Sequence, residues 1–282
     1  MTLIFSARIL VLLFFFIMIH PIPSEAFDAK TKEFKDFSAD LKMHFKKMGW
    51  NDLHPERINW QYYRKSQMKR PLVFTAFGES KKDITIFLGG VHGDESPSVY
   101  IMFRLAEFLK QNPHLYKNKT IIIAPLINPD GFFRTPQTRA NARGVDINRN
   151  FPTGNWHSAH QDRYFPGPSA NSESETKFQV ALINRYKPNK IISVHSPLGF
   201  YDYDGPSSDF DAIVVWLKKM SRENGLPLRR YKVFPGSLGN YAGVERKIHT
   251  LTIELPSSVP QQSAKNFDRM KRTLLDVLDI SF

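Results

Sequence analysis

The sequence contains no cysteine among its 282 residues. Disulfide bonds, thiolate metal ligands and a cysteine nucleophile are therefore excluded, and stability has to come from a hydrophobic core. The chain also lacks an internal repeat and an apolar run of the ~20 residues that a membrane-spanning helix needs. Acidic residues are comparatively few, 27 against 39 basic ones, which gives a formal net charge of +12.

What is present in quantity is apolar and aromatic. Hydrophobic residues make up 41% of the chain and aromatic residues 13%, with 23 Phe. This composition supports a sizeable core and excludes a disordered chain. The length suits one large domain or two small ones.

The first 26 residues have the pattern of a secretory signal peptide. Arg8 precedes an unbroken apolar run of eleven residues, Ile9–Ile19, and Ser24 and Ala26 are small residues suited to a cleavage site. We expect cleavage after Ala26 and an exported protein, periplasmic or extracellular. The alternative is an uncleaved membrane anchor, for which the run is short.

The net charge predicts partners for an exported protein. A strongly basic chain is attracted to anionic surfaces such as cell-wall polymer or lipid headgroups. The alternative is a solvated basic face that has no partner. Nucleic acid is not expected, because no nucleic-acid-binding motif is present and export argues against it.

The order of apolar segments predicts the fold. Residues 27–70 form a polar, basic N-terminal extension with helical spacing of Phe34, Phe37, Leu41 and Phe45. From residue 71 to residue 282 apolar runs alternate with amphipathic ones, which predicts a single-domain α/β/α sandwich around a mixed, largely parallel sheet. The expected strands are Val73–Ala76, Ile84–Leu88, Thr120–Leu126, Ile191–Val194 and Thr250–Leu255. The expected helices are Ser98–Gln111, Ser174–Tyr186, Asp209–Asn224 and Ala264–Leu278. Long loops are expected at Asn128–Ser172 and Ser196–Ser208, and loops of such length are usually functional.

Candidate metal ligands follow two of the expected strands. His92 and Glu95 are three residues apart in a glycine-rich turn, and His195 comes directly after another apolar run. Two imidazoles and a carboxylate are the ligand set of a catalytic zinc that keeps one position open. The alternatives are a polar turn whose Glu complements a helix dipole, and a structural histidine. His157 and His160 share a loop and are the rival third ligands.

Two further segments supply polar groups for catalysis. Arg139 to Asn150 holds three Arg and three Asn, a dense set of donors for a carboxylate or an oxyanion. Its alternative is a basic surface loop. Glu254 lies in an apolar strand, where burying a carboxylate is costly unless it has a purpose such as proton transfer. Its alternative is a structural ion pair with an arginine.

As an ordered set these motifs resemble the zinc carboxypeptidase, or metallocarboxypeptidase, family. They are HGDE at 92–95, NPDG at 128–131, RANARGVDINRNFP at 139–152, HS at 195–196 and TIEL at 252–255. The resemblance covers about Val73 to Leu255 and implies the family's α/β fold and one bound zinc ion.

The resemblance also implies roles for particular residues. His92, Glu95 and His195 would be the zinc ligands, and Asp146 would orient His92. Glu254 would be the general base and Arg139 would polarise the scissile carbonyl. Asn148 and Arg149 would bind the terminal carboxylate of the substrate. The family also uses a tyrosine upstream of the catalytic Glu, for which Tyr231 is the candidate and Tyr241 the alternative.

Within the family, the stretches 195–206 and 236–243 resemble the branch that contains murein tripeptide amidase. This implies a zinc-dependent hydrolase that cleaves the γ-D-glutamyl–diaminopimelate bond of peptidoglycan stem peptides. Asp204, or Asp202, could then meet the distal ammonium of diaminopimelate. The alternatives are a secreted carboxypeptidase acting on ordinary peptides, an aminoacylase-type deacylase, and a wall-binding protein on a degenerate hydrolase fold.

Overall fold

The computed structural model describes residues 32–158, 162–206, 210–229 and 232–280. The expected signal peptide at 1–26 therefore lies outside the described residues. Within those ranges no helix combines the length and the apolar character that crossing a membrane requires.

The described residues form one seven-stranded sheet in the order β1-β2-β4-β3-β5-β7-β6. The strands are β1 (Gln61–Lys65), β2 (Pro71–Phe77), β3 (Ile84–Leu88), β4 (Thr120–Ala124), β5 (Lys190–His195), β6 (Phe200–Asp204) and β7 (His249–Glu254). The central strands β4, β3, β5 and β7 run parallel, whereas β1, β2 and β6 pair antiparallel with their neighbours. The prediction of a mixed, largely parallel sheet is confirmed. Every residue of β3, β4 and β5 is buried, as the apolar runs require.

Two strands were not expected from the sequence. β6 lies within Ser196–Ser208, so the expectation of a long loop there was wrong. Its sequence Phe-Tyr-Asp-Tyr-Asp alternates aromatic and acidic residues, with Phe200, Tyr201 and Tyr203 buried. The acidic residues hide this strand from a search for apolar runs. β1 is likewise polar, and it adds the edge of the sheet from within residues 27–70.

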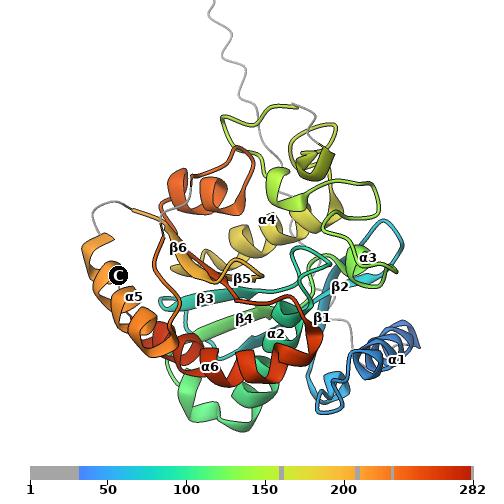
Figure 1. The fold of residues 1–282 in the computed structure, drawn as a ribbon, viewed down its shortest axis with the longest axis horizontal. Helices are drawn as coiled ribbons and strands as arrows, with labels where there is room; N and C mark the ends of the chain where they lie inside the picture. The colour runs from blue at the N-terminus through green and yellow to red at the C-terminus, as the bar shows by residue number, and fades with distance from the viewer. Residues whose placement is uncertain (1–31, 159–161, 207–209, 230–231, 281–282) are drawn as a thin grey trace, which may run out of the picture.

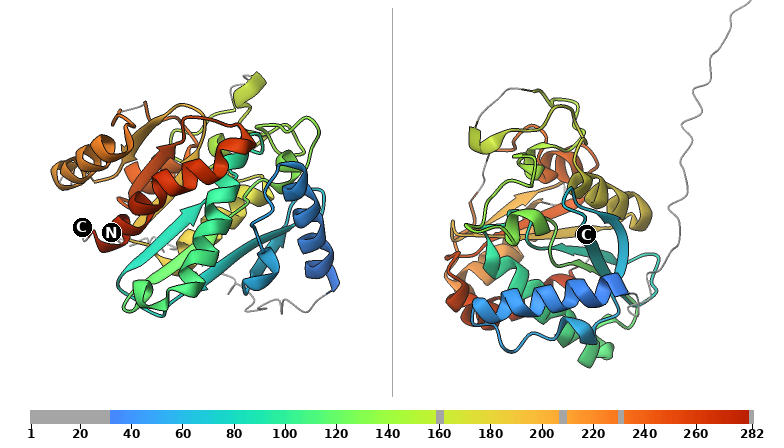
Figure 2. Two further views of the ribbon diagram at one scale, coloured as in Figure 1. Left: turned by 60° about the horizontal axis from the view of Figure 1, so that its bottom comes forward. Right: turned by 90° about the vertical axis from the view of Figure 1, so that its right-hand side faces the viewer.

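Helices cover both faces of the sheet, as Figures 1 and 2 show. α4 (Ser174–Tyr186) packs on one face, and α2 (Ser96–Gln111), α5 (Phe210–Asn224) and α6 (Ser263–Asp276) pack on the other. α1 (Lys32–Lys47) lies on the same side as α2, and the short α3 (Pro129–Phe132) follows β4. The resulting three layers are the predicted sandwich.

The N-terminal extension shares this core. Phe37, Leu41 and Phe45 of α1 are buried, and the Phe45 ring lies 5.2 Å from that of Phe103 on α2. The Tyr100 hydroxyl donates a hydrogen bond of 2.5 Å to Asp52, which also fastens the extension to α2. The extension therefore packs as part of the same body as the sheet.

Sheet topology brings the candidate residues together. β3, β5 and β7 are parallel neighbours, and His195 at the end of β5 pairs in register with Glu254 at the end of β7. The turn that holds His92 follows β3. The carboxyl ends of parallel strands meet at one edge of a sheet, which is where open α/β folds place their sites.

Candidate metal centre

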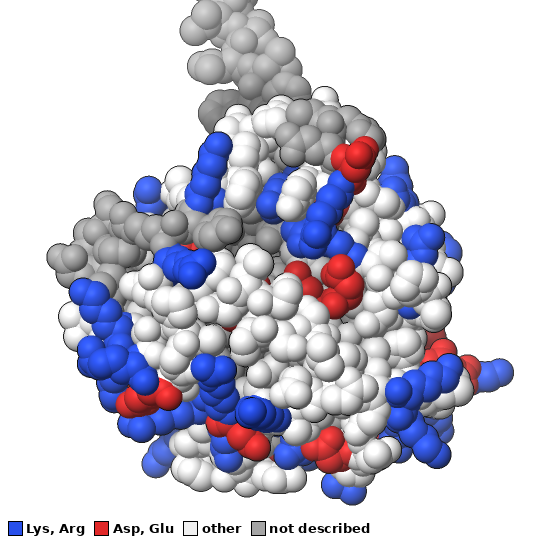
Figure 3. Space-filling view, in the orientation of Figure 1, with Lys and Arg blue, Asp and Glu red and all other residues white. Residues whose placement is uncertain are grey.

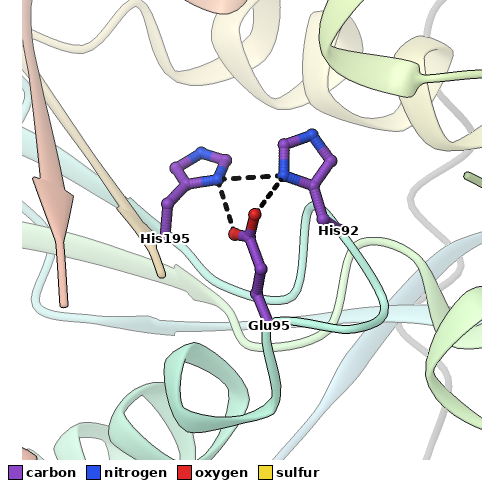
Figure 4. Close-up of side chains that lie close together, drawn as sticks. All are labelled: His92, Glu95 and His195. Carbon is purple, nitrogen blue, oxygen red and sulfur yellow. Dashed lines mark hydrogen bonds and ion pairs between the residues drawn. The ribbon is translucent and has the colours of Figure 1, made fainter. Parts of the chain in front are cut away.

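His92, Glu95 and His195 point toward one another at this edge, as Figure 4 shows. The Glu95 carboxylate lies 2.7 Å from Nδ1 of His92 and 2.9 Å from Nδ1 of His195. The two Nδ1 atoms are 3.3 Å apart. All three side chains are buried, so the protein shields the cluster from bulk water except where it faces the cavity.

The separation of the two Nδ1 atoms fits a zinc ion. Zn–N distances of about 2.0–2.1 Å in a tetrahedral site place neighbouring ligand atoms roughly 3.3 Å apart, as the two Nδ1 atoms are. Burial alone would raise the pKa of Glu95, but the adjacent imidazoles of His92 and His195 lower it well below its usual range. Glu95 is therefore ionised, as a metal ligand must be. Three protein ligands leave a fourth position open, which is the pattern of a catalytic zinc.

Each imidazole is oriented by a partner on its other nitrogen. Nε2 of His92 lies 3.2 Å from Oδ1 of Asp146, which is fully buried, and Nε2 of His195 lies 2.9 Å from the Ser193 hydroxyl. Both contacts favour the tautomers that leave the Nδ1 lone pairs facing the centre. Ser193 was missed from the sequence because a serine within a buried strand carries no distinctive signal. Its i, i+2 spacing from His195 places both side chains on one face of β5.

The turn that carries His92 packs against the NPDG turn. A Cβ on Gly93 would lie 2.2 Å from the carbonyl carbon of Gly131, so only glycine permits this approach. Asn128 closes the second turn by accepting a hydrogen bond from the Gly131 amide at 2.9 Å. Its Nδ2 also donates to the carbonyl oxygen of Arg139 at 3.0 Å. The NPDG motif thus aligns the metal turn with the arginine loop.

Glu254 projects beside the metal cluster without belonging to it. The Leu198 amide lies 3.5 Å from its Oε2, and none of the described arginines forms an ion pair with it. Burial raises the pKa of Glu254 above its ordinary value, although the charge of His195 opposes the shift. A carboxylate with a raised pKa beside the open metal position is suited to proton transfer.

The arginine loop places its donors beside the metal cluster, with Nη1 of Arg139 3.2 Å from Nδ1 of His92. Arg139 donates from Nε to Oδ2 of Asp146 at 2.9 Å, so the aspartate that orients His92 also fixes this guanidinium. Oδ1 of Asn148 accepts a hydrogen bond of 2.9 Å from the Leu238 amide. Arg149 lies 4.4 Å over the Phe234 ring and has no carboxylate partner in the described ranges. Burial lowers the pKa of Arg149, and the charge of Arg139 adds to this effect. An anion bound at Arg149 would offset both effects, because it favours the charged guanidinium.

Two carboxylates on β6 line the cavity that holds these groups. Asp202 and Asp204 share one face of the strand, two residues apart. Gly239 lies so close that a Cβ there would be 2.0 Å from Oδ2 of Asp204. Burial first, and the charge of Asp202 second, raise the pKa of Asp204 to about 7. An ammonium group placed here would favour the ionised form.

All these groups face one cavity of about 670 Å³. Of the residues predicted from the sequence, it is lined by His92, Glu95, Arg139, Asn148, Arg149, His195, Asp204 and Glu254. Asp146 supports them from behind. Tyr231 and the rival ligand His160 fall outside the described residues. The alternative Tyr241 is buried in the core against Phe151 and is not part of the lining. His157 lines the cavity but does not join the described metal cluster.

The arginine loop is anchored by two buried glutamates that differ in their partners. Asn141 donates to Oε2 of Glu173 at 2.8 Å and to Oε2 of Glu175 at 3.2 Å. Glu173 also accepts from the Ser172 hydroxyl and pairs with Arg143. Oε1 of Glu175 has no hydrogen-bond partner among the described residues. Burial raises the pKa of Glu175 to about 7.

We therefore expect Glu175→Gln to stabilise the fold above pH 7. The pKa of Glu175 is about 4.5 in the unfolded chain and about 7 in the folded one. Protonated Glu175 therefore contributes its full stabilisation of the folded state below about pH 4.5, and this contribution is lost as pH rises through about 7. Ionised Glu175 then costs on the order of 2–3 kcal/mol, which a neutral amide avoids. Thermal unfolding should show a higher Tm for Glu175→Gln at pH 8 and a smaller difference at pH 5. Glu173→Gln is the control and should not gain stability at pH 8. An equal Tm change for Glu175→Gln at both pH values would contradict the assignment.

A model of the family described as zinc carboxypeptidase matches residues 49–230. The chain belongs to the zinc carboxypeptidase family. This agrees with the His-Glu-His cluster, and it makes the chain a hydrolase. The matched residues include the three ligand candidates and the arginine loop, whereas Glu254 lies beyond them and is placed by the structure.

Among curated members of the zinc carboxypeptidase family, the chain is 28% identical over 219 residues to murein peptide amidase A of Escherichia coli. That match covers 73% of this chain and 85% of the relative. The murein peptide amidase A of Vibrio campbellii is 31% identical over 206 residues, covering 69% of this chain and 78% of the relative.

Solved structures of a carboxypeptidase and of a murein-tripeptide amidase resemble this fold. The crystal structure of murein-tripeptide amidase from Escherichia coli superposes with a TM-score of 0.61 at 26% identity, covering 79% of this chain and 92% of that one. Carboxypeptidase A from Helicoverpa armigera has a TM-score of 0.66 at 17% identity, covering 91% of this chain and 76% of that one. The second likeness shows the fold, and it confirms the predicted zinc carboxypeptidase-like architecture.

Proposed function

We propose that this protein is an exported hydrolase that uses one zinc ion to cleave the γ-D-glutamyl–diaminopimelate bond of peptidoglycan stem peptides. The observation that carries the proposal is the charge arrangement of the cavity. The cavity that contains the metal cluster is also lined by Arg149, a cation for a substrate carboxylate, and by Asp202 and Asp204, anions for a substrate ammonium. The similarity to murein peptide amidase A supports the same substrate class.

The reaction needs a proton acceptor, an oxyanion partner and a metal. When bound at His92, Glu95 and His195, zinc lowers the pKa of water to about 7 and polarises a carbonyl oxygen. Glu254 takes the proton of the attacking water and later delivers it to the leaving amine. Arg139, held by Asp146, donates to the carbonyl oxygen as negative charge develops there.

The leaving residue is recognised by its charges. Its terminal carboxylate would be held by Arg149, whose half-buried guanidinium has no carboxylate within ion-pair distance among the described residues, together with Asn148. Diaminopimelate carries a second amino acid centre at the far end of its side chain. Its ammonium group would lie against Asp204 in the lining of the cavity, with Asp202 two residues away on the same strand.

We expect Asp204→Asn to raise KM about tenfold or more for substrates whose last residue carries a distal ammonium, because a charge-assisted hydrogen bond is lost. Asp204 is ionised mainly above about pH 7. KM for these substrates should therefore fall as pH rises from 6 to 8, and the Asn variant should lose that dependence. Steady-state kinetics on peptides ending in diaminopimelate and in Ala would check this. Equal effects on both substrate types would refute the assignment.

The proposed activity is tested by product analysis. The zinc-loaded protein, residues 27–282, is incubated with L-Ala-γ-D-Glu-meso-diaminopimelate and the products are identified by mass spectrometry. We expect free diaminopimelate and the dipeptide, with no products after chelation and recovery after zinc is added back. An intact tripeptide in the zinc-loaded sample would overturn the proposal.

The second candidate is a carboxypeptidase acting on ordinary peptides. Asp204 favours it too, because a carboxylate in the cavity lining would also accept hydrogen bonds from the side chain of a C-terminal Lys or Arg. A wall-binding protein without activity is disfavoured, since binding alone requires neither the complete metal cluster nor Glu254.

Export and attraction to an anionic wall remain part of the proposal. Figure 3 shows Lys and Arg gathered at the lower left, over α5. Lys218, Lys219 and Arg222 of that helix are exposed. Such a surface would concentrate the protein on an anionic polymer, in a salt-dependent manner.

A further inference from the structure

Three arginines lie around one aromatic ring in the lining of the cavity. The guanidinium carbons of Arg139, Arg149 and Arg163 lie 5.3, 5.4 and 6.0 Å from the ring centroid of Tyr164. All four residues line the cavity. A tyrosine ring presents its electron-rich face to cations, so it can hold like charges near each other that would otherwise separate.

The three arginines differ in whether a carboxylate of the protein pairs with them. Arg139 is paired with the buried Asp146 at 2.9 Å. Arg149 rests on Phe234 and is assigned to the terminal carboxylate of the substrate. Arg163 is exposed and, in the part of the chain that the structure describes, no carboxylate lies within ion-pair distance of it. One substrate carboxylate would therefore leave Arg163 without an anion.

We infer that Arg163, positioned by Tyr164, binds a second carboxylate, carried by the residue on the N-terminal side of the scissile bond. The inference rests on the proposed function and narrows its substrate class. A glutamate joined through its side-chain carboxyl keeps its α-carboxylate free on the same residue that carries the scissile carbonyl. An ordinary α-linked peptide has a carboxylate there only when that residue is Asp or Glu. Arg163 and Arg149 flank the same ring, so they can contact successive residues of one substrate.

The test compares substrates that differ only in that carboxylate. The zinc-loaded protein is assayed on L-Ala-γ-D-Glu-meso-diaminopimelate and on the same tripeptide with the α-carboxylate converted to a carboxamide. We expect kcat/KM to favour the carboxylate about tenfold, since a charge-assisted hydrogen bond is replaced by a neutral contact. Arg163→Gln should bring this ratio close to one. A wild-type ratio near one, or an unchanged ratio in Arg163→Gln, would overturn the inference.

Two sets of variants separate the subsite from general effects. Arg222→Gln removes the same charge from an exposed position on α5 outside the cavity and should leave the ratio at its wild-type value. Tyr164→Phe keeps the ring and should keep the ratio, whereas Tyr164→Leu should lower it. If the carboxylate-to-carboxamide ratio fell equally in Arg222→Gln, the preference would come from the net charge of the protein and not from a local subsite. That result would contradict the inference.

A parallel pair of α-linked peptides, with Asp or Asn before a C-terminal Lys, keeps the two proposals distinguishable. If γ-linked substrates are not cleaved but these are, the proposed function fails. The Asp-to-Asn ratio then tests Arg163 on its own. A preference for Asp that is lost in Arg163→Gln would support the subsite, and equal rates would reject it.

Discussion

Glu254→Gln should lower kcat by about 10²–10⁴-fold while zinc remains bound. Glutamine has nearly the same shape, and its amide oxygen can still accept from the Leu198 amide. It cannot take a proton from water or return one to the leaving amine. Glu254 is outside the cluster of His92, Glu95 and His195, so metal affinity should be nearly unchanged.

The measurement pairs steady-state kinetics with the zinc content found by atomic absorption after dialysis. Glu79→Gln is a matched control, because Glu79 is an exposed glutamate that does not line the cavity. Activity of Glu254→Gln within about threefold of wild type would remove Glu254 from the mechanism. Loss of zinc from this variant would instead make Glu254 a ligand.

His195→Ala should lose both the metal and the activity. It removes one of three ligand atoms that lie within 4.8 Å of one another, and it leaves Glu95 with a single imidazole partner. Two ligands form an incomplete site for zinc, which takes three protein ligands in catalytic centres. We therefore expect less than a tenth of the wild-type zinc after dialysis, and no measurable turnover.

Ser193→Ala gives a graded comparison. It keeps the His195 ring but removes the hydroxyl 2.9 Å from Nε2. Loss of such an orienting partner typically lowers metal affinity by about 10–100-fold. Competition with a chromogenic chelator would rank the three proteins as wild type, Ser193→Ala, then His195→Ala. Full zinc occupancy in His195→Ala would contradict the ligand assignment.

Much of this site could be predicted from the sequence because its residues follow buried strands. Apolar runs marked β3, β5 and β7, and the polar residues directly after them or at their ends had to meet at one edge of a parallel sheet. His92, His195 and Glu254 were placed in this way. The family resemblance predicted the roles of the remaining residues, including Asp146 as the partner that orients His92.

The sequence could not show partners that depend on side chains packing across the fold. β6 was missed because its cavity-facing residues include Asp202 and Asp204, whose polarity resembles that of a loop. Tyr164 was missed because a single tyrosine in a loop carries no periodic signal. Its role depends on Arg139 and Arg149, which lie 25 and 15 residues before it in the sequence and are brought to its ring by the fold.

The measurement that tests the account most directly is a competition in one reaction. Equal amounts of L-Ala-γ-D-Glu-meso-diaminopimelate, L-Ala-γ-D-Glu-L-Lys and the α-linked peptide L-Ala-L-Ala-L-Lys are given to the zinc-loaded protein, and their disappearance is followed by mass spectrometry. We predict that the diaminopimelate peptide is consumed at least about tenfold faster than the α-linked peptide, which offers a terminal carboxylate to Arg149 and an ammonium to Asp204 but no carboxylate to Arg163. Faster consumption of the α-linked peptide would contradict the account and make the protein a general carboxypeptidase.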